Sequence, residues 1–306
     1  MKKLLSYVLF GTEGRFWNQI PYILIANAAT YPDFHMKFYV HKDCVDYTLF
    51  PLLSEPAKAF DNIEIEVVDE PIQGTRLTIW RMKPLWEDDA DYLFCRDLDY
   101  IVTEMERKAV EFFLQAKDRY TMCMRCYHLH TIPFMAGLCG FKVREVFRSI
   151  KNKAATFNDY LQYGIDELHL DVFAGSEGPE EWVWGCDQKL LGAFFAPMLK
   201  KEEHHLDCPL QTGESAPLVG WNFKKANYKN YKDIELPKEC DKEIMDFSKD
   251  LLGSLFIGQP YCIAGYHTNR LIEMACSKGF PIAEVLKKTF KDHPEIVFNL
   301  DEGRPS

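Results

Sequence analysis

The sequence has 306 residues, of which 47% are hydrophobic and 14% aromatic, so the chain can bury a large core and long disordered stretches are not expected. Its formal net charge of −10 argues against nucleic acid as a partner, because surfaces that bind nucleic acid are basic. The ten cysteines are spread irregularly and several lie inside apolar runs, which is typical of reduced thiols in a cytoplasmic protein rather than of a disulfide framework.

The chain begins with an apolar run over residues 4–10 that predicts a strand. The first ten residues also look like a signal peptide, but the apolar part is short and no small-residue cleavage site follows. A turn at residues 11–15 and a helix over residues 16–29 come next. No apolar run elsewhere is long enough to span a bilayer, so we expect no integral membrane segment.

Two further strands are predicted at residues 36–41 and 63–68. Between them, residues 45–59 predict a helix that Pro51 interrupts. The alternation of strand, helix, strand, helix and strand is typical of a parallel sheet of the nucleotide-binding kind. The sequence therefore predicts an α/β fold.

The most informative stretch is residues 93–99, Leu-Phe-Cys-Arg-Asp-Leu-Asp. Its apolar residues predict a buried strand, and Asp97 and Asp99 come directly after that strand. Open α/β sheets bind ligands at the carboxyl ends of their strands. Carboxylates there suit Mg²⁺ or Mn²⁺, particularly when phosphates complete the coordination. A turn with two solvated acids stays open as the simpler alternative, because short Asp-x-Asp strings are common by chance and only the strand context supports the metal site.

The rest of the chain predicts two strands, several helices and one irregular region. The strands lie at residues 120–124 and within 133–143. The helices lie at residues 103–116, which begin with a Thr103-x-x-Glu106 capping box, at 143–163, from 182 onward and at 281–290. The irregular region covers residues 200–262. We interpret residues 1–200 as a catalytic core and residues 201–306 as a carboxyl-terminal part packed on the same domain.

Several other side chains are candidates for chemistry. Asp187 begins a helix, where the helix dipole favours a carboxylate and from which a carboxylate can also project over a substrate. Gly137 either lets a ligand approach the backbone or forms a bulge. The stretch from Cys123 to His130 holds zinc-ligand residue types, but in an extended chain Cys123 points away from the other three, which favours a strand end instead.

Taken together, the ordered segments resemble the nucleotide-sugar-dependent glycosyltransferases of the GT-A fold, and most closely bacterial and viral-type members with an Arg-Asp-x-Asp motif. The resemblance covers about residues 4–260, and one departure from it is Cys126. It rests on the following residues: Ser6 to Gly11, Trp80-Arg81, Arg96-Asp97-Leu98-Asp99 with residues 106–113, Met124-Arg125 with His130, Ala136 to Gly140, Asp187-Gln188, His205-Leu206-Asp207 and Phe256 to Gln259.

The resemblance implies a Rossmann-type sheet of about seven mostly parallel strands with helices on both faces. It implies a nucleotide-diphosphate sugar as donor, a glycan or glycoconjugate as acceptor, and Mn²⁺ or Mg²⁺ as cofactor. Asp99 would bind the cation directly, and Asp97 would contact the ribose or the water shell of the metal. His205 would be the third ligand, with His267 as its rival.

The same resemblance implies the remaining roles. Phe10, Gly11 and Arg81 would lie along the nucleoside and diphosphate, and Gly137 would approach the donor sugar. Asp187 would face the acceptor hydroxyl or the anomeric carbon, and it would be the general base if the reaction inverts configuration. Two alternatives stay open: a sugar nucleotidyltransferase, and a non-catalytic glycosyltransferase-like protein that binds sugars or acts as a scaffold.

Overall fold

The structure, a computed structural model, describes residues 1–70, 76–100, 102, 104–125, 134–168, 186–199, 204–209, 240–252 and 265–296. In these residues seven strands form one sheet in the order β3-β2-β1-β4-β6-β5-β7. The strands are β1 (Lys3–Leu9), β2 (His35–His41), β3 (Ile63–Val68), β4 (Tyr92–Arg96), β5 (Thr121–Arg125), β6 (Leu138–Lys142) and β7 (His205–Pro209). Only β6 runs antiparallel to its neighbours, so the predicted mostly parallel sheet is confirmed.

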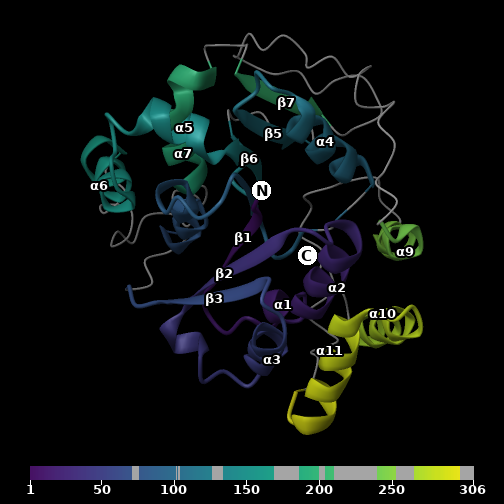
Figure 1. Cartoon of the computed structure of the whole chain (residues 1–306). Helices are drawn as coiled ribbons and strands as arrows, with labels where there is room; N and C mark the ends of the chain where they lie inside the picture. Colours follow the sequence, from purple (N-terminus) through teal and green to yellow (C-terminus); the bar gives the residue numbers. More distant parts are fainter. Residues whose placement is uncertain are drawn as a thin grey trace.

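Helices cover both faces of the sheet, as expected. The helices are α1 (Gly14–Trp17), α2 (Ile20–Thr30), α3 (Pro51–Ala59), α4 (Glu104–Gln115), α5 (Val143–Ile150), α6 (Phe157–Leu168), α7 (Cys186–Leu199), α9 (Lys242–Leu252), α10 (Gly265–Ser277) and α11 (Pro281–Asp292), with 3-10 helices η1 (Lys42–Cys44) and η2 (Arg76–Trp86). One hydrophobic cluster joins the sheet to α2, α3, α4, α10 and α11, and a second joins it to η2, α5, α6 and α7. Figure 1 shows α5, α6 and α7 grouped apart from α2, α3, α10 and α11.

Alternation along β1 explains how one strand serves both clusters. Leu5, Tyr7 and Leu9 belong to the cluster under α2, whereas Leu4 belongs to the cluster under η2. The helix α2 is apolar on every side and almost fully buried, because it lies between the sheet and the layer of α9, α10 and α11. Among the described residues no helix is both long and apolar enough to span a membrane.

Three secondary-structure expectations need correction. Pro51 does not interrupt a helix but begins α3, because a first-turn proline lacks only an N–H that would be unbonded anyway. The predicted helix over residues 143–163 is two helices, α5 and α6, separated by a turn around Ala154. The region 200–262 is not wholly irregular, since it contributes β7 and α9.

The strand order creates a crevice at the centre of the sheet. From β1 the chain goes outward through β2 and β3, then returns so that β4 pairs with the other side of β1. The connection that leaves β1 therefore runs toward β2 and β3, and the connection that leaves β4 runs toward the other half of the sheet, formed by β6, β5 and β7. In doubly wound sheets this switch point, at the carboxyl ends of the strands, is where ligands bind.

Candidate functional site

A pocket of about 290 Å³ lies at the carboxyl ends of β1 and β4, that is, at the switch point. This volume is close to the lower end of the range for small-molecule sites, about 300 Å³. The pocket is lined by Val8, Leu9, Phe10, Glu13, Phe16, Thr78, Arg81, Arg96, Asp97, Leu98, Asp99, Asp187 and Gln188. The structure thus brings together four of the predicted polar site residues, Arg81, Asp97, Asp99 and Asp187, and places Phe10 beside them.

Arg81 lies at the centre of the charged groups and is almost fully buried. Its guanidinium bridges two carboxylates, since Nη1 donates to Asp97 and Nη2 donates to Asp187 Oδ2 at 2.6 Å. Two more of its N–H groups are used: Nε donates to the Thr78 carbonyl at 3.0 Å and Nη1 to the Arg96 carbonyl at 3.3 Å. Burial alone would lower the pKa of Arg81, but Asp97 and Asp187 outweigh it and raise the pKa, so Arg81 is always charged.

Asp97 fits its place because position 137 is glycine. Arg96 pairs with Leu138 across β4 and β6, so Asp97 is level with Gly137. A Cβ atom at Gly137 would lie 1.9 Å from Asp97 Oδ2 and 2.1 Å from Asp97 Cγ. The glycine therefore makes room for the Asp97 carboxylate, whose side chain is 49% exposed. The sequence leaves two roles open for Gly137, close approach of a ligand or a bulge; in the structure the side chain of Asp97 makes a close approach to it.

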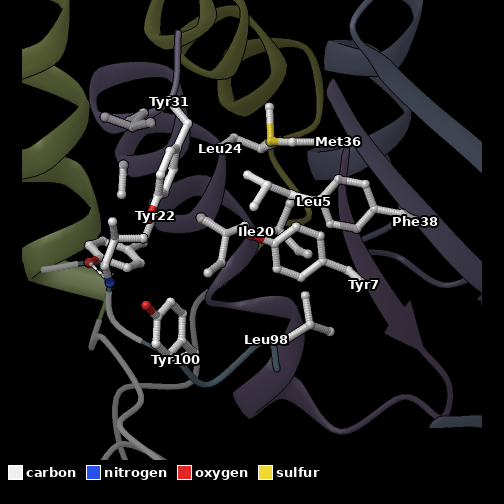
Figure 2. Packing of buried hydrophobic residues seen from close by; sticks show 14 of the residues in the cluster. Leu5, Tyr7, Ile20, Tyr22, Leu24, Tyr31, Met36, Phe38, Leu98 and Tyr100 are labelled. Atoms are coloured by element: carbon white, nitrogen blue, oxygen red, sulfur yellow. Dashed lines mark hydrogen bonds between the residues drawn. The ribbon is translucent and has the colours of Figure 1, made fainter. Parts of the chain in front are cut away.

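The segment after β4 alternates between the core and the pocket. Leu98, Tyr100 and Val102 are buried in the cluster under α2, and Figure 2 shows Leu98 and Tyr100 beside Ile20 and Tyr7. Asp97 and Asp99 fall between them and line the pocket. The chain turns at Leu98 and Asp99, and the anchored apolar residues leave both carboxylates at the pocket.

The first turn of the chain forms the apolar wall of the pocket. Gly11 has φ = +73°, a left-handed conformation that favours glycine. Its carbonyl accepts hydrogen bonds from Trp17 Nε1 at 3.0 Å and from Cys44 Sγ at 3.3 Å. Burial raises the pKa of Cys44 to about 11, so the thiol stays protonated and can donate. These two bonds fix the turn that carries Phe10 and Phe16 into the pocket lining, although Gly11 itself does not line it.

Asp187 reaches the pocket from the first turn of α7, as the sequence predicted. It is nearly buried, and both of its oxygens accept hydrogen bonds: Oδ2 from Arg81, and Oδ1 from the backbone N–H of Gln188 at 2.8 Å. The exposed N–H groups of a helix start favour a carboxylate there. Arg81 and α7 together hold this side chain in place.

The structure does not bring His205 to the pocket, so it gives no support to the expected role of His205 as a metal ligand. It pairs with Thr121 at the start of β5, which is level with Phe141 and, through it, with Leu93. His205 thus lies about 13 Å back along the strands from Asp97 and three strands away. Its Nδ1 is 2.8 Å from Thr121 Oγ1, and the ring packs against Phe134.

The structure also places His267, the rival metal ligand, and Cys123, the first residue of the zinc motif. His267 is in the first turn of α10, a helix that packs on α2 and α11, and it is not among the residues that line the pocket. Cys123 is buried in β5, where its sulfur accepts a hydrogen bond from the Met135 N–H at 3.2 Å. The other three residues of the zinc motif, between 126 and 130, lie outside the described residues.

The pocket fits only one kind of divalent-cation site, in which the substrate supplies some of the ligands. In the part of the chain that the structure describes, no cluster of three or more histidine, cysteine or acidic side chains could hold a metal ion. Mg²⁺ usually takes one or two protein carboxylates and completes its shell with water and substrate phosphates. Asp97 and Asp99, with the space that Gly137 leaves, fit such a shared site and not one made wholly of protein ligands.

Sequence reasoning missed part of the pocket. Glu13 and Phe16 belong to the turn and helix after β1, and Thr78 belongs to η2, one turn before Arg81. The signal that leads to Glu13 and Phe16 is their position directly after the first strand, since β1 borders the switch point. No comparable signal marks Thr78.

Comparisons with known proteins leave the family open. No protein-family model matches the chain, and no curated protein matches it. Among solved structures, an active-site mutant of LgtC has 11% identity and a TM-score of 0.40, over 83% of this chain and 96% of that chain. The glycosyltransferase GlyE of Streptococcus pneumoniae TIGR4 has 13% identity and a TM-score of 0.39, over 95% of this chain and 64% of that chain.

A third structure, the mannosyltransferase PcManGT of Pyrobaculum calidifontis in complex with GDP-Man and Mn²⁺, has 12% identity and a TM-score of 0.34 over 97% of this chain and 81% of that chain. At such identities and TM-scores the three likenesses carry no argument about this chain. Its function has to be argued from its own pocket.

Proposed function

We propose that the protein is a metal-dependent glycosyltransferase that moves a sugar from a nucleotide-diphosphate sugar to a glycan or glycoconjugate acceptor. One observation carries the proposal: a pocket at the switch point of a mostly parallel sheet gathers Asp97, Asp99 and Asp187 around Arg81, beside an apolar wall that includes Phe10. Carboxylates for a cation, a fixed guanidinium and an apolar surface for a nucleoside base are what the reaction needs.

The charge of the pocket supports the need for a cation. Four carboxylates line it against two guanidinium groups, and one of those two, that of Arg96, is already paired with the buried Glu106. A diphosphate that enters alone meets a net negative wall. A divalent cation between Asp97, Asp99 and the phosphates would turn this repulsion into attraction.

Each side chain then has a defined task. Asp97 and Asp99 would hold Mn²⁺ or Mg²⁺, which when bound supplies Lewis-acid stabilisation of the departing β-phosphate. Phe10 would lie along the nucleoside. Arg81, with one of its five N–H groups left by the bonds described above, would hold Asp97 and Asp187 in place and offer that last N–H to the ligand. Asp187 would accept the proton of the acceptor hydroxyl.

A thermal-shift panel of nucleotide sugars, with and without Mn²⁺, tests the proposal. A ligand at about 100 times its dissociation constant stabilises the folded protein by roughly 2.7 kcal/mol, which gives a visible rise in Tm. We expect a rise with one nucleotide sugar that depends on Mn²⁺. The Asp99→Asn variant should lose the Mn²⁺ dependence with its own Tm nearly unchanged, whereas Asp166→Asn, which removes one exposed charge of α6, should keep it.

Other outcomes separate the alternatives. Stabilisation by nucleoside triphosphates but by no nucleotide sugar would favour a sugar nucleotidyltransferase. A nucleotide sugar that binds without any turnover in the presence of acceptors would favour a non-catalytic binding protein. An Asp99→Asn variant with unchanged Mn²⁺ dependence would remove the cation from this pocket.

A further inference from the structure

At the wall of the pocket, a fully buried ion pair joins β4 to α4. Arg96 is the last residue of β4 and Glu106 lies in the first turn of α4; their side chains are 1% and 0% exposed. Arg96 Nε donates to Glu106 Oε1 at 3.0 Å, and Arg96 Nη2 lies 2.9 Å from the same oxygen. Arg96 Nη1 also donates to the carbonyls of Cys95 at 2.8 Å and Cys139 at 3.3 Å. The guanidinium thus ties together the ends of β4, β6 and α4.

The chain between these two residues is the segment that carries the pocket aspartates. It begins at Asp97 and packs back on the pair, because the Tyr100 ring lies 5.7 Å from the Arg96 guanidinium carbon. The N–H of Val102 donates to the hydroxyl of Tyr22 on α2 at 3.1 Å, which fixes the far end of the segment. Figure 2 shows Tyr22 and Tyr100 among the buried residues of this cluster. The pair closes a loop of about ten residues around Asp97 and Asp99.

Stability does not account for such a pair. Removing two charges from water is costly, and their attraction seldom exceeds that cost, so apolar residues of similar volume often serve as well or better. Burial alone would lower the pKa of Arg96, but Glu106, Tyr31 and Tyr7 together outweigh it and raise the pKa, so the guanidinium is charged. A buried pair that directional hydrogen bonds hold to two strands and one helix restricts geometry more than apolar contacts would.

We propose that Arg96 and Glu106 are positioning residues that set the separation and orientation of the Asp97 and Asp99 carboxylates, and through these the affinity of the pocket for a divalent cation. This inference rests on the proposed function, because it presupposes that the two aspartates hold a cation. Neither residue touches the cation; they act through the loop that they close. Residues that hydrogen-bond to the ligands of a metal change affinity by about ten- to a hundredfold when they are replaced, and we expect an effect of this order from the pair that holds the backbone of Asp97 and Asp99.

Binding of Mn²⁺ to the full chain, measured by electron paramagnetic resonance and by calorimetry, tests the inference without any assay of activity. The main variant is the double substitution Arg96→Met with Glu106→Leu, which leaves no unpaired buried charge and is expected to fold. Its Tm should match or exceed that of the wild type, while its affinity for Mn²⁺ falls about ten- to a hundredfold. The single variant Glu106→Gln should also lose affinity where it folds.

A matched control is available on the same helix. Glu111 pairs with Arg107 at 2.6 Å within α4, so Glu111→Gln removes one negative charge without touching the loop. This variant should bind Mn²⁺ as the wild type does. If the double variant folds and keeps wild-type affinity and an unchanged resonance spectrum, the inference is overturned while the cation site stands. If the wild type binds no Mn²⁺ either alone or together with a nucleoside diphosphate, the proposed function fails, and the inference fails with it.

Discussion

The substitution Gly137→Ala tests how the pocket holds Asp97. The new Cβ would lie 1.9 Å from Asp97 Oδ2, 2.1 Å from Cγ and 2.6 Å from Oδ1, far inside any van der Waals contact. The backbone of Gly137 adjoins β6, which is hydrogen-bonded on both sides, so the Asp97 side chain has to move instead. We expect the carboxylate to rotate toward solvent, because its side chain is already 49% exposed.

The magnitude follows from the contact that this rotation breaks. Loss of a hydrogen bond between charged groups costs about 1.5–3 kcal/mol, and the exposure of Asp97 reduces this through solvent screening to about 1 kcal/mol. Such a loss lowers the Tm by about 2–4 °C. The effect on the ligand should be larger, because Asp97 no longer faces the pocket. We expect binding of Mn²⁺ and of a nucleotide sugar to fall by at least about tenfold in calorimetry, because loss of a proposed ligand should cost no less than loss of a ligand's hydrogen-bond partner.

Two controls make the result specific. In the Asp97→Ala background the space beside Gly137 is open, so adding Gly137→Ala should cost almost nothing further, and the two substitutions should be non-additive by about 1 kcal/mol. Gly140→Ala, within β6, would place a Cβ 2.7 Å from the Phe94 ring and 2.9 Å from Met122, so it should destabilise the core but leave Mn²⁺ affinity intact. Additive effects of the first two substitutions would refute the reasoning.

Three further substitutions probe the surroundings of the pocket. Gly11→Ala should destabilise the fold by about 1–2 kcal/mol in urea unfolding, because φ is +73°, although the new Cβ would meet no atom. Gly279→Ala, at φ = +80°, should lower the stability by the same amount and leave ligand binding unchanged. Equal ligand binding by the two variants would contradict the role of the Gly11 turn in the pocket. Arg81→Lys should lose about 3 kcal/mol or more, because an ammonium group cannot bridge two carboxylates, and a Tm like that of the wild type would exclude the bridge. Burial alone would raise the pKa of Glu87, but Lys83 and Lys37 together outweigh it and lower the pKa, so the ionised Glu87 stabilises the fold fully above about pH 4.3 and less as the pH falls further. In urea unfolding, the wild type should therefore be more stable than Glu87→Gln at about pH 7, and the two stabilities should converge near pH 3. A difference that persists at about pH 3 would refute this.

The sequence was sufficient for the parts of the fold that depend on local pattern. Apolar runs predicted β1 to β4 in order, and the position of Asp97 and Asp99 directly after one of them put both at the carboxyl edge of the sheet. Asp187 was expected in the first turn of a helix, where the structure has it. These features follow from strand and helix periodicity together with the rule that ligands bind at strand ends.

What the sequence could not supply depends on contacts between distant segments. The bridge from Arg81 to Asp187 joins residues 106 positions apart, and the fit of Gly137 against Asp97 requires that β6 lie antiparallel beside β4. The place of His205 along its strand cannot be predicted either, because a histidine near a strand marks neither end of it. The structure puts it at the start of β7, so a parallel neighbour carries it away from the edge where the aspartates lie.

Asp187 leaves one question of mechanism that its geometry sharpens. Each of its oxygens accepts one hydrogen bond, from Arg81 and from the Gln188 N–H, yet a carboxylate offers about four lone-pair sites, so an acceptor hydroxyl still finds a place on it. If the product has inverted configuration, as nuclear magnetic resonance of the anomeric proton would show, Asp187→Asn should lower kcat by about 10²–10⁴-fold, because the general base is lost while Asn keeps the shape. If configuration is retained, no such base is needed, and the variant should mainly raise the acceptor KM. Inverted product formed by Asp187→Asn at the kcat of the wild type would remove the base role from this residue.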